Sequence, residues 1–99
     1  MSETISEEML TLPPSGIWNH VSKISILEDK PIMLDYWLDS TKKEVIIGIR
    51  ENDEKLLVKN AEEYTSPIAK IYKIEEVFII CTENSIYITS SDIEKRKIS

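Results

Sequence analysis

The stretch IAKIYKIEEVFIICTENSIYIT, residues 68–89, contains three runs of β-branched and aromatic residues. The runs are residues 68–74, 77–81 and 86–88. Such residues favour the pleated surface of a strand. Two polar corners separate the runs, Glu75–Glu76 and Thr82–Ser85, and the Asn, Ser and Thr of the second corner suit a turn. The stretch therefore predicts a three-stranded antiparallel meander.

Both faces of this meander are expected to be apolar. With tight corners, one face carries Tyr72, Ile79 and Ile88, and the other carries Ile71, Ile80 and Tyr87. A sheet that faces water alternates apolar with polar residues, whereas a sheet with apolar residues on both faces is buried on both sides. This pattern is typical of the middle of a barrel or sandwich.

Alternation earlier in the chain predicts further strands. The alternation predicts a first strand over residues 21–27, with one face exposed to solvent, and a second strand over residues 32–39, which begins after Pro31. A corner at Ser40–Lys43 leads to a strand over residues 45–49, which would pair with the second strand. In that pairing Leu38 lies opposite Val45, Tyr36 opposite Ile47, and Leu34 opposite Ile49. A two-residue hairpin loop at Asn52–Asp53 then returns the chain through Leu56–Val58, which completes a second meander.

The ends of the chain carry helical signals. Capping-box spacing of Asn60 with Glu63 predicts one helical turn over residues 61–64, and that of Ser91 with Glu94 a short helix over 92–97. Residues 1–16 are expected to be a flexible or docking arm, because Pro13 and Pro14 interrupt regular structure. Residues 17–99 then form a single all-β domain of six to seven short antiparallel strands. A small barrel and two packed three-stranded meanders both fit this pattern.

Composition narrows the function classes. The 99 residues include 18 acidic and 12 basic ones, which gives a net charge of −6, so a phosphate backbone should repel the chain. The single Cys81 fits a buried, reduced thiol in the cytoplasm. There is no basic and apolar leader and no apolar run of about 18 residues, so neither secretion nor a membrane span is expected.

The sequence holds no catalytic constellation. Adjacent carboxylates, such as Glu28–Asp29 and Glu62–Glu63, fall at predicted turns, where water solvates them. His20 is the only histidine, and two glycines cannot build a phosphate loop. We therefore expect no enzyme, and no cofactor, metal or small-molecule substrate.

A binding or assembly module is the interpretation that remains. The expected contact residues for a protein partner, or for a second copy, lie on the arm and on a strand face: Leu12, Ile17, Trp18, Met33, Trp37 and Ile46. Aromatic residues and Met are enriched in binding hot spots, although Trp37 can equally be buried under the arm of its own chain. One alternative is an acidic nucleic-acid mimic that blocks a nucleic-acid-binding protein. A weaker alternative is nucleic-acid binding through Lys70, Tyr72, Lys73 and Tyr87.

Four short strings of the C-terminal half carry a family resemblance. They are EKLLVK at 54–59, EYTSP at 63–67, IYK at 71–73 and TENSIYI at 82–88. With them the chain resembles small uncharacterised proteins of large cytoplasmic DNA viruses. The resemblance implies an intracellular viral product, either a virion component or a host-interaction factor in the host cytoplasm. It implies no catalytic or binding residue.

Overall fold

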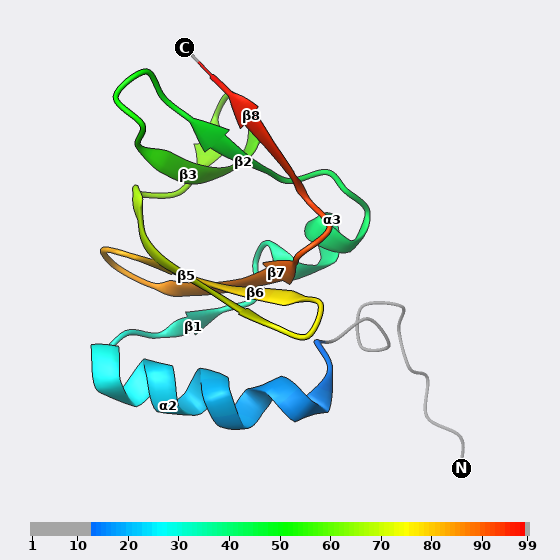
Figure 1. Cartoon of the computed structure of the whole chain (residues 1–99), viewed down its shortest axis with the longest axis vertical. Helices are drawn as coiled ribbons and strands as arrows, with labels where there is room; N and C mark the ends of the chain where they lie inside the picture. The colour runs from blue at the N-terminus through cyan, green and yellow to red at the C-terminus, as the bar shows by residue number, and fades with distance from the viewer. Residues whose placement is uncertain (1–12, 99) are drawn as a thin grey trace.

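The structure is a computed structural model that describes residues 13–98, so Leu12 and most of the predicted arm lie outside the described residues. It has three layers: a helix, a sheet that we call sheet A, and a second sheet, sheet B (Figure 1). Within the described residues the helical elements are η1 (Ser15–Ile17), α2 (Trp18–Glu28) and α3 (Trp37–Thr41). The strands are β1 (Ile32–Met33), β2 (Ile46–Ile49), β3 (Lys55–Asn60), β4 (Glu63–Tyr64), β5 (Ile68–Ile74), β6 (Val77–Thr82), β7 (Ile86–Ser90) and β8 (Glu94–Lys97).

Each sheet has four strands and mixed direction. Sheet A has the order β1-β7-β6-β5, and sheet B has the order β4-β3-β2-β8. In each sheet one edge strand is parallel to its neighbour, β1 to β7 and β8 to β2, and the other neighbours are antiparallel. The fold is mostly β, as predicted, but it is neither purely antiparallel nor closed into a barrel.

The predicted meander over residues 68–89 is confirmed as β5, β6 and β7. Its register is the expected one, since one row is Tyr72, Ile79 and Ile88 and the other is Ile71, Ile80 and Tyr87. The first corner turns at Glu75, which adopts a left-handed φ of 56°. At the second corner, the hydroxyl of Thr82 accepts hydrogen bonds from the backbone N–H groups of Asn84 and Ser85.

Two cores explain why both faces of sheet A are apolar. The first core lies between α2 and sheet A and contains Ile17, Val21, Trp37, Val77, Ile79, Cys81, Ile86 and Ile88. The second core lies between the two sheets and contains Tyr36, Val45, Ile47, Leu57, Ile80 and Ile93. The meander is thus the middle layer, with each face covered by a different partner.

The prediction of a strand over residues 21–27 is wrong, because this segment belongs to helix α2. Its inward side chains, Ile17, Val21 and Ile24, recur three or four residues apart, which is the spacing of one helix face. The alternating pattern of Ser and Ile fits both periods over so short a segment, and packing against sheet A decides between them. The helix ends at Asp29, which takes a left-handed conformation with φ of 55°.

The predicted strand over residues 32–39 is correct only at Ile32–Met33. Residues 37–41 form helix α3 instead, so the predicted pairs between this segment and residues 45–49 do not exist. A buried side chain holds the helix in place: the hydroxyl of Ser40 donates to the carbonyl of Trp37 at 2.6 Å and accepts from the N–H of Ser90 at 2.9 Å. This contact with β7 could not be read from the local pattern.

Strand β8 pairs with the edge of β2 that the sequence analysis pairs with residues 32–39. Residues 92–97 were expected to form a helix, but Glu94–Lys97 pairs with Ile46–Ile49 in parallel. Likewise, the helical turn expected at 61–64 is a tight turn followed by β4. The side chain of Asn60 does accept the expected hydrogen bonds, from the N–H groups of Glu62 and Glu63. No helix follows this turn, because Tyr64 pairs with Val58 in sheet B.

The hairpin predicted at Asn52–Asp53 forms between β2 and β3, but its loop has three residues, 51–53, and not the two expected. Asp53 has a left-handed φ of 68°, and the Asn52 side chain accepts a hydrogen bond from the N–H of Glu54. A backbone hydrogen bond from Arg50 N–H to the Glu54 carbonyl closes the loop. This hairpin fixes which residues of β2 and β3 share a face.

Replacing Ser40 with Ala should lower the free energy of unfolding by about 1–3 kcal/mol, because the Ser90 N–H then loses its acceptor in a largely buried place. Thr41→Ala is the matched control. The Thr41 hydroxyl also donates to a helix carbonyl, that of Leu38, but in an exposed position, so its loss should cost less than about 0.5 kcal/mol. Urea denaturation of both variants measures the difference, and equal losses would contradict this role of Ser40.

Candidate functional site

The outer face of sheet B, which points away from sheet A, is the best candidate site. The register pairs Ile46 with Val58 and Gly48 with Leu56, and it places Ile47 beside Leu57. Ile47 and Leu57 belong to the second core. Because side chains alternate along a strand, Ile46, Leu56 and Val58 point to the opposite, outer face.

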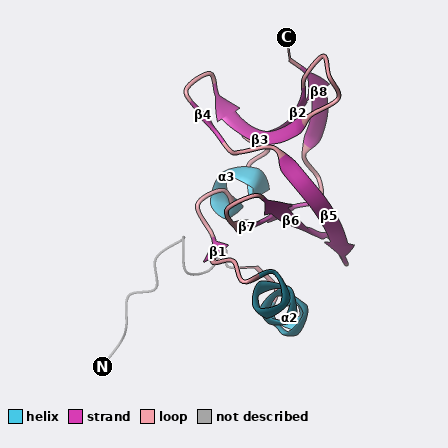
Figure 2. Ribbon diagram, turned by 90° about the vertical axis from the view of Figure 1, so that its left-hand side faces the viewer, coloured by secondary structure: helices cyan, strands magenta, loops and turns pink. Residues whose placement is uncertain are grey.

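This outer face is hollowed. Figure 2 shows sheet B curved, with β4 and β8 as its two edges. The hollow has a volume of about 1070 Å³, and we call it the sheet B hollow. Its apolar lining consists of Ile46, Leu56, Val58, Ala61, Tyr64 and Ile98. Leu56 is buried at its base, Ile46 and Val58 are half-buried, and Tyr64 is 52% exposed.

Gly48 sits in the middle of the sheet beneath the hollow. A Cβ atom at this position would lie 2.8 Å from Cδ1 of Ile98 and 3.1 Å from Cγ2 of Val58. The absence of a side chain therefore lets Ile98 lie flat across β2, where it becomes part of the apolar lining. Any larger residue would displace one of these two neighbours.

The rim of the hollow is charged but largely self-neutralised. Its cations are Lys43, Arg50 and Arg96, and each has a carboxylate partner: Asp92 at 3.2 Å, Glu54 at 3.1 Å, and Glu94, respectively. Lys59 also borders the hollow, but its ammonium group lies over the ring of Tyr36, in the second core, and contacts Asp39 at 3.0 Å. The hydrogen bond to Asp39 raises the pKa of Lys59. A rim whose cations are already paired is a poor phosphate site, and an apolar base suits a protein side chain better.

The residues predicted to bind a partner do not form one surface. Ile46 lines the sheet B hollow, whereas Ile17 and Trp37 are buried in the first core and Trp18 packs against it. Met33 is half-buried on β1, in the other sheet. The expected face of Met33, Trp37 and Ile46 is therefore wrong, because Trp37 lies on a helix and not on a strand paired with β2.

Sequence reasoning missed most of the hollow. It read Leu56, Leu57 and Val58 only as the core of a returning strand, and Tyr64 as part of a helical turn. One signal was available, since three consecutive apolar residues in a strand must place at least one on each face. An apolar outer face on β3, opposite the equally apolar Ile46, follows from that pattern.

The residues considered for nucleic-acid binding also separate. Lys73 is exposed, Lys70 is bound to Glu28, and Tyr72 is partly exposed. Tyr87 packs edge-on against Tyr36 between the two sheets, with ring centroids 5.3 Å apart. Burial raises the pKa of Tyr36. Tyr87 therefore cannot stack on a base together with Tyr72.

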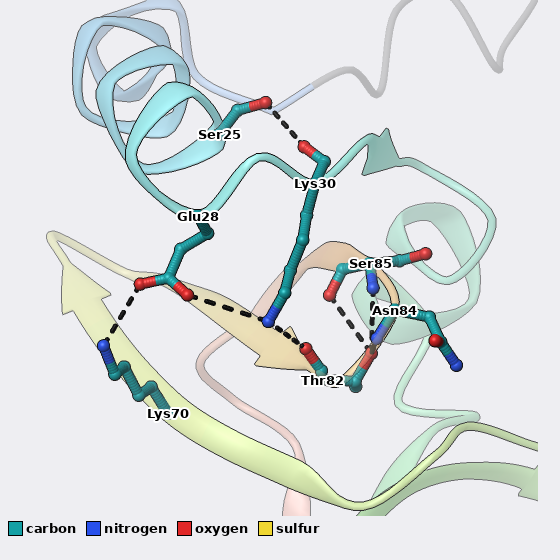
Figure 3. Close-up of polar contacts among 7 residues, drawn as sticks. All are labelled: Ser25, Glu28, Lys30, Lys70, Thr82, Asn84 and Ser85. Carbon is teal, nitrogen blue, oxygen red and sulfur yellow. Dashed lines mark hydrogen bonds and ion pairs between the residues drawn. The ribbon is translucent and has the colours of Figure 1, made fainter.

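A second polar cluster lies where α2 meets sheet A (Figure 3). Glu28 contacts Nζ of Lys70 at 3.1 Å and Nζ of Lys30 at 3.7 Å. Lys30 also donates to the carbonyl of Thr82 at 2.7 Å, and the hydroxyl of Ser25 donates to the carbonyl of Lys30 at 2.7 Å. Every charge in the cluster has a partner within the chain. The cluster stabilises the packing of the helix end on sheet A, through Lys70 of β5 and Thr82 of β6.

Electrostatics agree with a structural role for this cluster. The hydrogen bond and the positive charge of Lys70 lower the pKa of Glu28, and the same hydrogen bond raises the pKa of Lys70. Burial raises the pKa of the nearby Cys81 thiol, which makes it a weaker nucleophile at neutral pH. Residues 13–98 contain no group of three His, Cys, Asp or Glu side chains placed to hold a metal ion. None of the described helices has the length and apolar character to cross a membrane.

Comparison with known proteins adds no relative: no family model, curated protein or solved structure matches this chain.

Replacing Glu28 with Gln should destabilise the fold at neutral pH but not in acid. The folded pKa of Glu28 is below its ordinary value of 4.5. Its ionised form therefore stabilises the fold above pH 4.5, and this contribution is lost as the pH falls through the folded value. Urea midpoints of both proteins should differ at pH 7 and converge in acid. Glu83→Gln, on an exposed turn, controls for the loss of one negative charge, and a gap that stays constant with pH would contradict the ion pair.

Proposed function

We propose that this chain is a non-enzymatic protein-binding or assembly module and that the sheet B hollow is its binding surface. One observation carries the proposal: among the described residues, the hollow is an apolar sheet face that no other layer covers. Both faces of sheet A and the inner face of sheet B are packed against other elements. An uncovered, hollowed apolar face with a polar rim is typical of a protein interaction site.

The shape of the hollow indicates the kind of partner. A concave apolar surface is filled by a convex element, such as the apolar side of a helix, as in other groove-binding modules. The paired charges of the rim, including Arg50 with Glu54, would surround such a contact and exclude water from it. We infer that the apolar lining provides affinity and that the rim limits which sequences fit.

The nucleic-acid mimic is the weaker of the two proposals. Mimicry of a phosphate backbone needs acidic side chains in a row on one face. In this fold the adjacent acids lie at separate places, with Glu28 and Asp29 at the end of α2, Glu62 and Glu63 at the start of β4, and Glu75 and Glu76 between β5 and β6. Solvation of turns accounts for this distribution.

The resemblance to small proteins of large DNA viruses suggests where such a binding surface would act. A viral product with such a surface would act either as a virion component or as a factor that binds a host protein in the cytoplasm. An intracellular site is consistent with the buried thiol of Cys81. The apolar surface serves either role, because assembly and host binding both depend on burying it.

Tyr64→Ser and Val58→Lys test the proposal in an affinity purification at moderate salt. A partner held by the hollow should bind about tenfold more weakly to Tyr64→Ser, which removes an aromatic anchor. It should be lost with Val58→Lys, which places a charge on the lining. Tyr72→Ser is the matched control, since Tyr72 is a partly exposed tyrosine on sheet A. Partners that all four proteins recover equally would contradict the proposed surface.

A further inference from the structure

Helix α2 presents an apolar surface at the opposite end of the molecule from the hollow. Figure 1 shows α2 below sheet A and sheet B above it. Ile26 and Leu27, near the end of the helix, are 79% and 82% exposed. Scattered exposed apolar residues are ordinary, but two adjacent ones on the outer side of a helix form a convex apolar ridge. The molecule thus carries a convex apolar helix at one end and a concave apolar sheet at the other.

Apart from the ion pairs of the rim and the exposed Asp29 that follows the helix, the unpaired charges of the two surfaces have opposite signs. The outer side of α2 consists of Asn19, His20, Ser22, Lys23, Ile26 and Leu27, with no acidic residue. The one carboxylate of α2, that of Glu28, is directed at Lys70 and Lys30 (Figure 3). The rim of the hollow includes Glu44 and Glu51. Over residues 13–98, neither of these carboxylates nor Lys23 takes part in an ion pair.

The lengths of the two surfaces are compatible. Helix α2 has 11 residues and rises 1.5 Å per residue, so it is about 17 Å long. Strand β3, which crosses the hollow, has six residues and is about 20 Å long at 3.3 Å per residue. The exposed side of α2 is therefore short enough to lie along this strand.

We propose that the occupant of the sheet B hollow is helix α2 of a second copy of this chain. The inference rests on the proposed function of the hollow and names its partner. In the complex, Ile26 and Leu27 of one copy contact Val58, Ile46 and Tyr64 of the next. Lys23 then lies near one of the two rim carboxylates, Glu44 or Glu51, which lie beyond opposite ends of β2. Like the packing within the chain, where the inner side of α2 covers sheet A, this contact sets a helix on a sheet, but it uses the outer side of α2 and the outer face of sheet B.

This contact is heterologous, because two different surfaces meet. Each copy in a pair still has one free helix and one free hollow, so further copies add head to tail until a ring closes or an open chain grows. A symmetric contact of two hollows would leave both partly empty, since two concave surfaces cannot fill one another. The expected product is a concentration-dependent series of oligomers and not a single dimer.

Two blocked variants test the arrangement. Ile26→Glu with Leu27→Glu removes the ridge at exposed positions, where it leaves the cores intact, and Val58→Lys blocks the hollow. In sedimentation velocity, the mean mass of the wild-type protein should rise with concentration, and each variant alone should remain monomeric. An equimolar mixture should form a one-to-one dimer, because the helix-blocked copy keeps an intact hollow and the hollow-blocked copy keeps an intact helix.

Several outcomes would overturn the inference. They are a wild-type chain that stays monomeric at all concentrations, a helix-blocked variant that still associates, and a mixture of the variants that does not dimerise. Circular dichroism and thermal melting establish that each variant is folded. Ile26→Ser with Leu27→Ser, and Tyr64→Ser, are milder replacements if a charged variant does not fold.

The self-assembly inference and the proposed function can fail separately. If the wild-type chain is monomeric but captures another protein through Val58, the hollow is a binding surface and only the identity of its occupant is wrong. If Val58→Lys changes neither self-association nor capture, both are wrong.

Discussion

The fold depends on one strand, β6, whose two faces are both withdrawn from water. Its two edges pair with β5 and β7, so its backbone groups are satisfied, and its side chains alternate between the two cores, with Ile79 in one and Ile80 in the other. A sheet that is apolar on both faces requires a covering layer on each. Helix α2 supplies one and sheet B supplies the other. Within residues 13–98, sheet B has no equivalent layer on its own outer face, and the candidate site is a consequence of that asymmetry.

The sequence was sufficient to predict the meander and its register, because there the local β pattern and the tertiary packing agree. It was insufficient where a short segment fits two periods. Residues 21–27 alternate like a strand, yet Val21 and Ile24 also share a helix face, and only the neighbouring sheet selects the helix. Strand β8 was missed for a different reason. Glu94–Lys97 has little strand propensity, and its partner β2 lies far away in the sequence, so no local signal exists for the pairing.

The candidate site was predictable only in part. Ile46 was recognised, but Tyr64 and Ile98 join it through β4 and through the segment after β8, neither of which was expected to lie in this sheet. Trp37, expected either on an exposed strand face or buried within its own chain, is buried in the first core, and Trp18 packs against that core. Aromatic content signals a large buried contact but does not say whether it is buried within a chain or between chains. Whether an aromatic residue is buried within the chain depends on which faces the other layers cover. That arrangement is set by the topology of the whole chain and not by the local sequence.

The two parallel pairings have a consequence for the order in which the chain folds. The meander needs only short corners to form, whereas β1 with β7, and β2 with β8, each close a loop of roughly fifty residues. Contacts that are distant in sequence form late, because the entropy of loop closure is lost before the contact compensates for it. The meander is thus a natural nucleus, and sheet B is complete only when β8 arrives. Until then one edge of β2 has no strand beside it. Unpaired strand edges and exposed apolar surface make a folding chain prone to aggregation, so the late arrival of β8 also covers the edge at which the unfinished sheet is open to neighbouring chains.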